Sequence, residues 1–124
     1  MPADKRRRVA VVGCTGKGDY GHDVDVVCKE SPRCEIVAVA DENPQGLAKA
    51  ARRLGVDRTF ADYRRMLDET RPDVLAICSR WVDRHAAMAV DAAQRGVHVF
   101  MEKPLCRTVA EADAVRSEEH TSEL

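Results

Sequence analysis

Short apolar runs alternate along the chain with longer segments in which apolar residues recur at helical spacing. The short runs are mostly rich in valine and isoleucine, which is typical of buried strands. Strands are predicted over residues 8–12, 35–40, 58–60, 73–78 and 97–101. Helices are predicted between them, over residues 21–30, 43–55, around 63–67 and 83–95, and a last helix begins near residue 108. The pattern thus alternates strand and helix throughout.

This alternation, with short connections, favours a parallel sheet that has helices on both faces. The second predicted helix has clear end signals in the sequence. Asn43 is a favourable N-cap, Pro44 suits the first helical position, and Gly55 suits a left-handed C-terminal cap. The sequence therefore predicts the doubly wound α/β class.

Composition narrows the functional classes. The 124 residues correspond to about one domain. The net charge of −1 does not indicate binding to nucleic acid or to an anionic membrane. No apolar run approaches the roughly 18 residues of a membrane span. The five cysteines have no paired spacing, which disfavours a disulfide framework or a metal site. We expect a cytoplasmic protein with reduced thiols.

The two ends of the chain differ from its middle. Residues 1–7 form a basic stretch that we interpret as a disordered tail. Residues 116–124 are polar, lack apolar spacing and resemble the translation of a sequencing-library adapter, so we expect an artefactual tail there. On this interpretation residues 8–115 are an incomplete domain, cut off before its last strand and before a C-terminal α/β domain.

A glycine-rich loop follows the first predicted strand, from Gly13 to Gly21. Such a loop lets backbone N–H groups approach a pyrophosphate closely, next to the positive end of a helix dipole. The literal G-x-G-x-x-G string begins at Gly16, but in a second register Gly13 comes first and Thr15 replaces the middle glycine. A nucleotide-triphosphate P-loop is excluded, because Lys17 lacks the required glycine and hydroxyl neighbours.

Asp41 ends the second predicted strand, about 20 residues after the loop, where an acid is expected to accept hydrogen bonds from an adenosine ribose. Its simpler role would be to cap a turn. The adjacent Glu42 and Asn43 supply no arginine that would neutralise a 2′-phosphate, so NAD is favoured and NADP stays possible. A methyltransferase that uses S-adenosylmethionine would show the same loop and acid.

Two segments distinguish a dinucleotide-binding oxidoreductase from such a methyltransferase: Ala76 to His85, and Gly96 through Glu102-Lys103-Pro104. Together with the loop they resemble the Gfo/Idh/MocA family of NAD(P)-dependent oxidoreductases. The resemblance implies a Rossmann domain in which Lys103 is catalytic, through hydrogen bonding or proton exchange with the reacting oxygen. The implied cofactor-binding residues are Gly13, Thr15, Gly16, Lys17, Gly18, Asp41, Ser79, Arg80 and Glu102, and no metal is implied.

The chain departs from the family after the fourth strand, where Ser79-Arg80-Trp81 replaces the common Thr-Pro turn. Arg80 and Trp81 could border the nicotinamide or pack at the domain edge. His85 matches a frequent family position, and we interpret it as a packing residue.

Membership of this family implies hydride transfer to or from a sugar, inositol or related polyol. We expect the full-length protein to be a homo-oligomer and the present fragment to show no turnover. Two alternatives stay open: a non-catalytic dinucleotide sensor, and a methyltransferase, against which the Glu102-Lys103-Pro104 run weighs.

Overall fold

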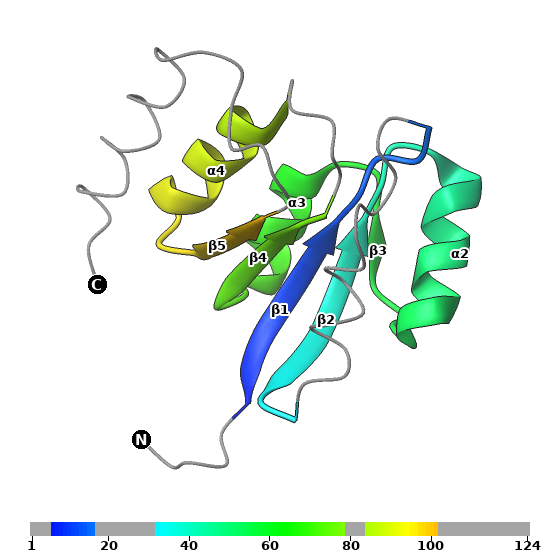
Figure 1. Ribbon diagram of the computed structural model, residues 1–124, viewed down its shortest axis with the longest axis horizontal. Helices are drawn as coiled ribbons and strands as arrows, with labels where there is room; N and C mark the ends of the chain where they lie inside the picture. The colour runs from blue at the N-terminus through cyan, green and yellow to red at the C-terminus, as the bar shows by residue number, and fades with distance from the viewer. Residues whose placement is uncertain (1–5, 17–31, 79–83, 102–124) are drawn as a thin grey trace.

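The computed structural model describes residues 6–16, 32–78 and 84–101. Within these residues five parallel strands form one sheet in the order β3-β2-β1-β4-β5 (Figure 1). The strands are β1 (Arg7–Val12), β2 (Cys34–Ala40), β3 (Thr59–Phe60), β4 (Val74–Ile77) and β5 (His98–Met101). The helices are α2 (Pro44–Leu54), α3 (Tyr63–Thr70) and α4 (His85–Gln94). The predicted doubly wound α/β fold is confirmed.

Alternate residues of each strand face opposite sides of the sheet, and the two sides are covered by different helices. On one side Val9 and Val11 of β1 pack with Ala50 and Leu54 of α2. On the other side Val12 of β1 belongs to a cluster built on α3 and α4. The members of that second cluster include Ala10, Ala38, Ala40, Met66, Leu67, Leu75, Ile77, Met88 and Ala92. Burial on both faces explains why β4 and the carboxyl-terminal halves of β1 and β2 are apolar.

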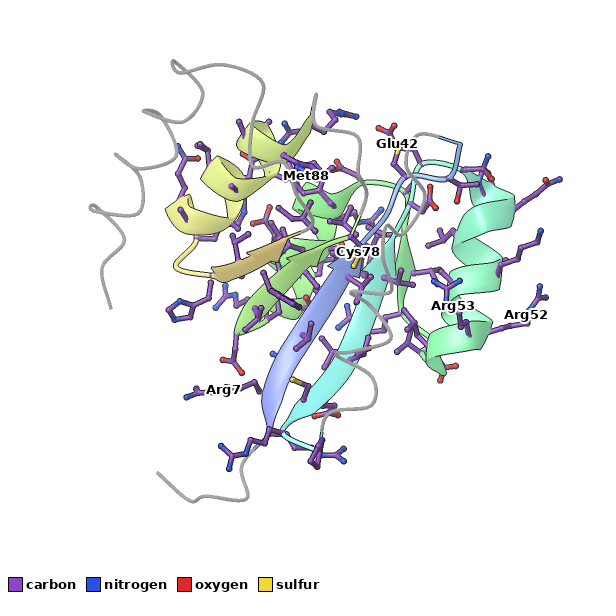
Figure 2. All side chains as sticks on the ribbon, in the orientation of Figure 1. Arg7, Glu42, Arg52, Arg53, Cys78 and Met88 are labelled. Carbon is purple, nitrogen blue, oxygen red and sulfur yellow. The ribbon has the colours of Figure 1, made fainter. Side chains whose placement is uncertain are left out.

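The ends of α2 follow the local signals in its sequence. The Asn43 side chain accepts a hydrogen bond from the Gly46 backbone N–H at 2.9 Å, and Pro44 occupies the first turn. Gly55 ends the helix in the left-handed conformation, with a φ of 70°. Arg52 and Arg53 lie in the last turn, where positive charge interacts favourably with the helix dipole (Figure 2). The predicted capping of this helix is confirmed.

Several predicted boundaries need correction. β1 begins at Arg7, inside the predicted tail, because its backbone N–H donates to the Arg33 carbonyl at 2.8 Å. α3 ends at Thr70 and is capped by Arg71, which adopts a left-handed φ of 46° without being glycine. Gly96 has a φ of 72° and follows α4, as predicted. The helices predicted over residues 21–30 and from residue 108 lie outside the described residues.

The strand order reverses beside β1. The chain proceeds outward from β1 through β2 to β3, and then crosses to β4 on the other side of β1. β1 and β4 are therefore adjacent strands whose successors, β2 and β5, lie on opposite sides of this pair. Such a switch point is where doubly wound sheets bind their ligands. In Figure 2, Glu42 lies at this edge, at the opposite end of the sheet from Arg7.

Candidate dinucleotide-binding site

The glycine-rich loop begins where β1 ends. The Gly13 backbone N–H donates to the Ala40 carbonyl of β2 at 3.1 Å, which extends the strand pairing to the start of the loop. Gly16 adopts a φ of +88°, a left-handed conformation that strains residues with a side chain. The described part of the loop therefore turns away from β1 at a position that favours glycine.

Asp41 directly follows β2 and is 2% exposed. Its carboxylate accepts a hydrogen bond from the Asn43 backbone N–H at 2.9 Å, as a turn-capping aspartate does. It also accepts from the Thr15 hydroxyl at 2.5 Å and from the Thr15 backbone N–H at 3.3 Å. Asp41 thus caps a turn and, at the same time, holds the glycine loop against the end of β2.

Gly46, in the first turn of α2, is a site residue that sequence interpretation missed. A Cβ atom at this position would lie 1.8 Å from Thr15 Oγ1 and 2.5 Å from Thr15 Cβ. Thr15 can therefore occupy its place beside Asp41 only because residue 46 has no side chain. The available signal was a glycine inside a helical segment, where it is about 1 kcal/mol less favourable than alanine.

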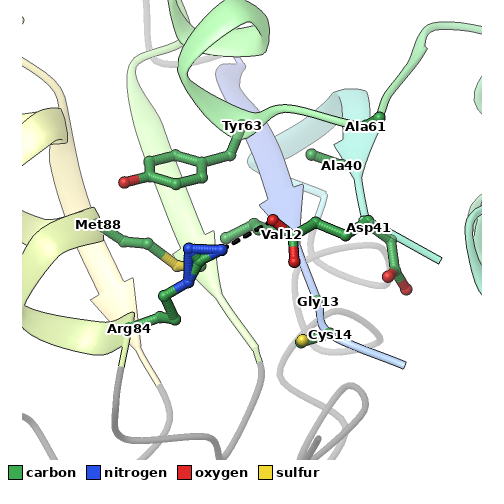
Figure 3. A pocket seen from close by; sticks show the side chains of 10 residues that line it. Val12, Gly13, Cys14, Ala40, Asp41, Ala61, Tyr63, Arg84 and Met88 are labelled. Carbon is green, nitrogen blue, oxygen red and sulfur yellow. Dashed lines mark hydrogen bonds and ion pairs between the residues drawn. The ribbon is translucent and has the colours of Figure 1, made fainter. Parts of the chain in front are cut away.

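A pocket opens beside this contact, at the carboxyl ends of β1 and β2 and on the α3–α4 side of the sheet (Figure 3). The residues that line it are Val12, Gly13, Cys14, Ala40, Asp41, Glu42, Ala61, Tyr63, Arg84 and Met88. Figure 3 shows the Asp41 carboxylate turned away from Arg84. The pocket is small and largely apolar, and the buried Asp41 is one of its lining residues.

Arg84, immediately before α4, is a second residue that sequence interpretation missed. Its Nη2 lies 2.8 Å from Glu42 Oε2, and this hydrogen bond raises the pKa of Arg84. The prediction considered only the chain neighbours of Asp41 and found no arginine among them. The structure adds an arginine that is distant in the sequence, because Arg84 lines the same pocket as Asp41 although 42 residues separate it from Glu42.

Tyr63, the first residue of α3, forms another wall of the pocket and is 6% exposed. Its hydroxyl donates to the Asp91 carboxylate of α4, which also accepts from Arg64 Nε at 2.9 Å. Burial, followed by the hydrogen bond to Asp91, raises the pKa of Tyr63 well above its ordinary value. The phenol therefore stays neutral near pH 7 and ties α3 to α4 beside the pocket.

The structure places Gly13, Thr15, Gly16 and Asp41 at the same edge of the sheet, and their binding of a cofactor stays a prediction. The other predicted site residues lie outside the described residues, and their roles stay predictions: Lys17, Gly18, Ser79, Arg80, Glu102 and Lys103. His85, the first residue of α4, is completely buried, in agreement with a packing role.

Residues 6–16, 32–78 and 84–101 contain no group of three or more His, Cys, Asp or Glu residues that could hold a metal ion. In the same ranges, no helix has the length and apolar character that crossing a membrane requires.

Three features together define the dinucleotide-binding class of doubly wound domains. They are a parallel sheet whose strand order reverses beside β1, a glycine loop after β1 and an acid after β2. The chain belongs to the Gfo/Idh/MocA family, because the family model described as "Oxidoreductase family, NAD-binding Rossmann fold" matches residues 7–123.

Known proteins agree with this assignment. The levoglucosan dehydrogenase of Pseudarthrobacter phenanthrenivorans is 37% identical over 78 residues, covering 62% of this chain and 20% of the relative. The inositol 2-dehydrogenase of Gluconacetobacter diazotrophicus is 34% identical over 113 residues, which cover 85% of this chain and 33% of that relative. An Agrobacterium radiobacter oxidoreductase, crystallised with NAD+, L-tartaric acid and magnesium, superposes with a TM-score of 0.84 at 20% identity. The match covers 95% of this chain and 33% of that structure's chain. The chain thus spans a third or less of these proteins.

Proposed function

We propose that the chain is the NAD-binding domain of an oxidoreductase that transfers a hydride to or from a sugar, inositol or related polyol. The observation that carries the proposal is the contact between Thr15 in the glycine loop and Asp41 after β2. This contact joins a loop suited to a pyrophosphate and an acid suited to ribose hydroxyls at one edge of the sheet. The names of the two dehydrogenase relatives support the substrate class.

The described residues fit this cofactor by their own chemistry. Gly16 has the backbone conformation of a tight turn, Asp41 is a hydrogen-bond acceptor, and the adjoining pocket is largely apolar. Gly13, Thr15 and Gly16, with Lys17 and Gly18, would hold the pyrophosphate. Asp41 would hold the adenosine ribose and would repel a 2′-phosphate, which favours NAD over NADP.

The nicotinamide end of the site would involve residues beyond the described ranges. Bound NAD would supply the carbon that accepts or donates the hydride. Lys103 would hydrogen-bond the reacting oxygen or exchange a proton with it. Glu102 would fix the loop that carries Lys103, and Ser79 and Arg80 would border the cofactor. We further propose that the full-length protein is a cytoplasmic homo-oligomer that acts on a small-molecule polyol.

Binding and turnover measured on the full-length protein test this proposal. NADH fluorescence should change on titration, and NAD+ should be reduced with at least one member of a panel of inositols and sugars. Lys103→Met should retain NADH binding but lose turnover by about 100-fold or more, the contribution typical of a proton-transfer group. NADH binding without turnover on any panel member would favour the sensor alternative. Displacement of NADH by S-adenosylmethionine would favour the methyltransferase.

A further inference from the structure

Tyr63 forms one wall of the pocket that adjoins Asp41, and it is almost completely buried. Figure 3 shows the Tyr63 ring beside Met88, with its hydroxyl pointing toward the side from which Met88 enters the pocket. A phenylalanine would supply the same apolar ring to the pocket without a buried hydroxyl that needs a partner. The partner of this hydroxyl therefore indicates what the tyrosine adds.

Two charged side chains hold Tyr63 in place. Its hydroxyl donates to Oδ2 of the Asp91 carboxylate. Arg64 Nε donates to the same oxygen at 2.9 Å, and the Arg64 guanidinium carbon lies 5.0 Å from the centre of the Tyr63 ring. Arg95 Nη1 lies 3.8 Å from Asp91 Oδ1, so the carboxylate has a cation near each of its oxygens. Asp91 is thus fixed, and it fixes the Tyr63 hydroxyl.

Neither Asp91 nor Arg64 lines the pocket. Asp91 lies about one turn of α4 beyond Met88, which does line it. The same helix therefore contributes one wall directly, through Met88, and holds a second wall through the hydrogen bond to Tyr63. A side chain that is ordered before its ligand arrives lowers the entropic cost of binding.

We infer that Asp91 is a positioning residue for the cofactor, which holds Tyr63 as a preformed wall against the adenosine half of NAD. The inference rests on the proposed function, because it presupposes that a dinucleotide binds beside Asp41. Asp91 acts through the Tyr63 hydroxyl and has no contact with the ligand. Without its carboxylate the Tyr63 ring adopts several orientations, and binding must include the cost of ordering it.

Kd values for NADH and ADP-ribose, measured on the full-length protein and its variants, test the inference. NADH is titrated by fluorescence, and ADP-ribose by displacement of NADH. Asp91→Ala and Tyr63→Phe should each weaken both ligands by about fivefold, within the range expected for ordering one side chain on binding. Asp91→Asn retains an acceptor oxygen for the Tyr63 hydroxyl and should recover most of the affinity.

The double variant distinguishes positioning from a merely structural role. In the Tyr63→Phe background, Asp91→Ala should change each Kd by less than about twofold, because the hydroxyl through which Asp91 acts is already absent. A structural role would lower the free energy of unfolding in urea in both backgrounds and leave the Kd values of the folded protein unchanged.

Asp68→Asn provides the matched control. Asp68 of α3 accepts a hydrogen bond from Arg95 Nε at 2.7 Å, immediately after α4, and it does not line this pocket. Its replacement removes a carboxylate that links the same two helices but makes no hydrogen bond to Tyr63. Both Kd values should therefore stay within about twofold of wild type.

The outcomes separate this inference from the proposed function. If folded Asp91→Ala binds NADH and ADP-ribose as wild type does, the inference is wrong and the proposed function stands; should Asp91→Ala not fold, unchanged Kd values for Tyr63→Phe lead to the same conclusion. An equal loss in the Tyr63→Phe background, or the same loss in Asp68→Asn, would also overturn the inference. If folded wild-type protein does not bind NADH, the proposed function fails and the inference fails with it.

Discussion

Gly46→Ala would place a methyl group where the structure leaves no room for one. The new Cβ would lie 1.8 Å from Thr15 Oγ1, 2.5 Å from Thr15 Cβ and 2.9 Å from Thr15 Cγ2. Non-bonded carbon atoms normally lie about 3.5–4.0 Å apart, so Thr15 or α2 must move by roughly 1 Å or more. Because the contact includes Thr15 Cβ, rotation of the side chain alone does not relieve it.

Three contributions set the size of the effect. Alanine is favoured over glycine in a helix by about 1 kcal/mol. Overpacking opposes this with about 1–3 kcal/mol, and loss of the Thr15 hydroxyl's bond to the Asp41 carboxylate costs about 1.5–3 kcal/mol more. The net expectation is a destabilisation of about 1.5–5 kcal/mol, opposite in sign to an ordinary glycine-to-alanine change in a helix.

The free energy of unfolding from urea denaturation measures this effect. Ala48→Gly, at an exposed position of the same helix, isolates helix propensity and should cost about 1 kcal/mol. Thr15→Gly in the Gly46→Ala background removes the clashing atoms, so the double variant should be less destabilised than the two single changes added together. A Gly46→Ala protein that is more stable than wild type by about 1 kcal/mol would refute the reasoning.

Three further predictions concern stability, each measured by urea denaturation. Tyr63→Phe should cost about 1.5–3 kcal/mol at neutral pH, because Asp91 loses a donor. Because the pKa of Tyr63 is raised in the folded protein, this contribution to stability is complete below pH 10.0, the ordinary tyrosine pKa, and is lost as the pH rises through the folded-state pKa. A Tyr63→Phe cost that is unchanged at strongly alkaline pH would contradict this prediction. Asn43→Ala removes the N-cap of α2 and should cost about 1 kcal/mol; no measurable cost would mean that the cap is dispensable. Arg71→Gly should stabilise the protein by up to about 1 kcal/mol, because Arg71 adopts a left-handed φ of 46°, and a loss of stability would count against that conformation.

The sequence predicted those features that depend on local signals. Asn43 and Gly55 mark the ends of α2 through their own backbone and capping preferences, which operate within a few residues. Asp41 could be placed at the end of β2 because the apolar run stops there. The parallel sheet with helices on both faces followed from the alternation of strands and helices.

Features that depend on long-range packing were not predictable in the same way. Arg84 reaches Glu42 only because the fold brings the start of α4 and the residue after β2 to the same edge of the sheet, across 42 residues of sequence. The steric need for Gly46 depends on where the loop places Thr15. Arg71 ends α3 in a conformation for which its residue type gives no signal.

The measurement that tests the central claim most directly is a crystal structure of the full-length protein with NADH. The account predicts that the pyrophosphate lies against the backbone of Gly13 to Gly16, and that an adenosine ribose hydroxyl donates to Asp41. NADH bound at a different edge of the sheet would contradict the account. So would a ribose that makes no contact with Asp41.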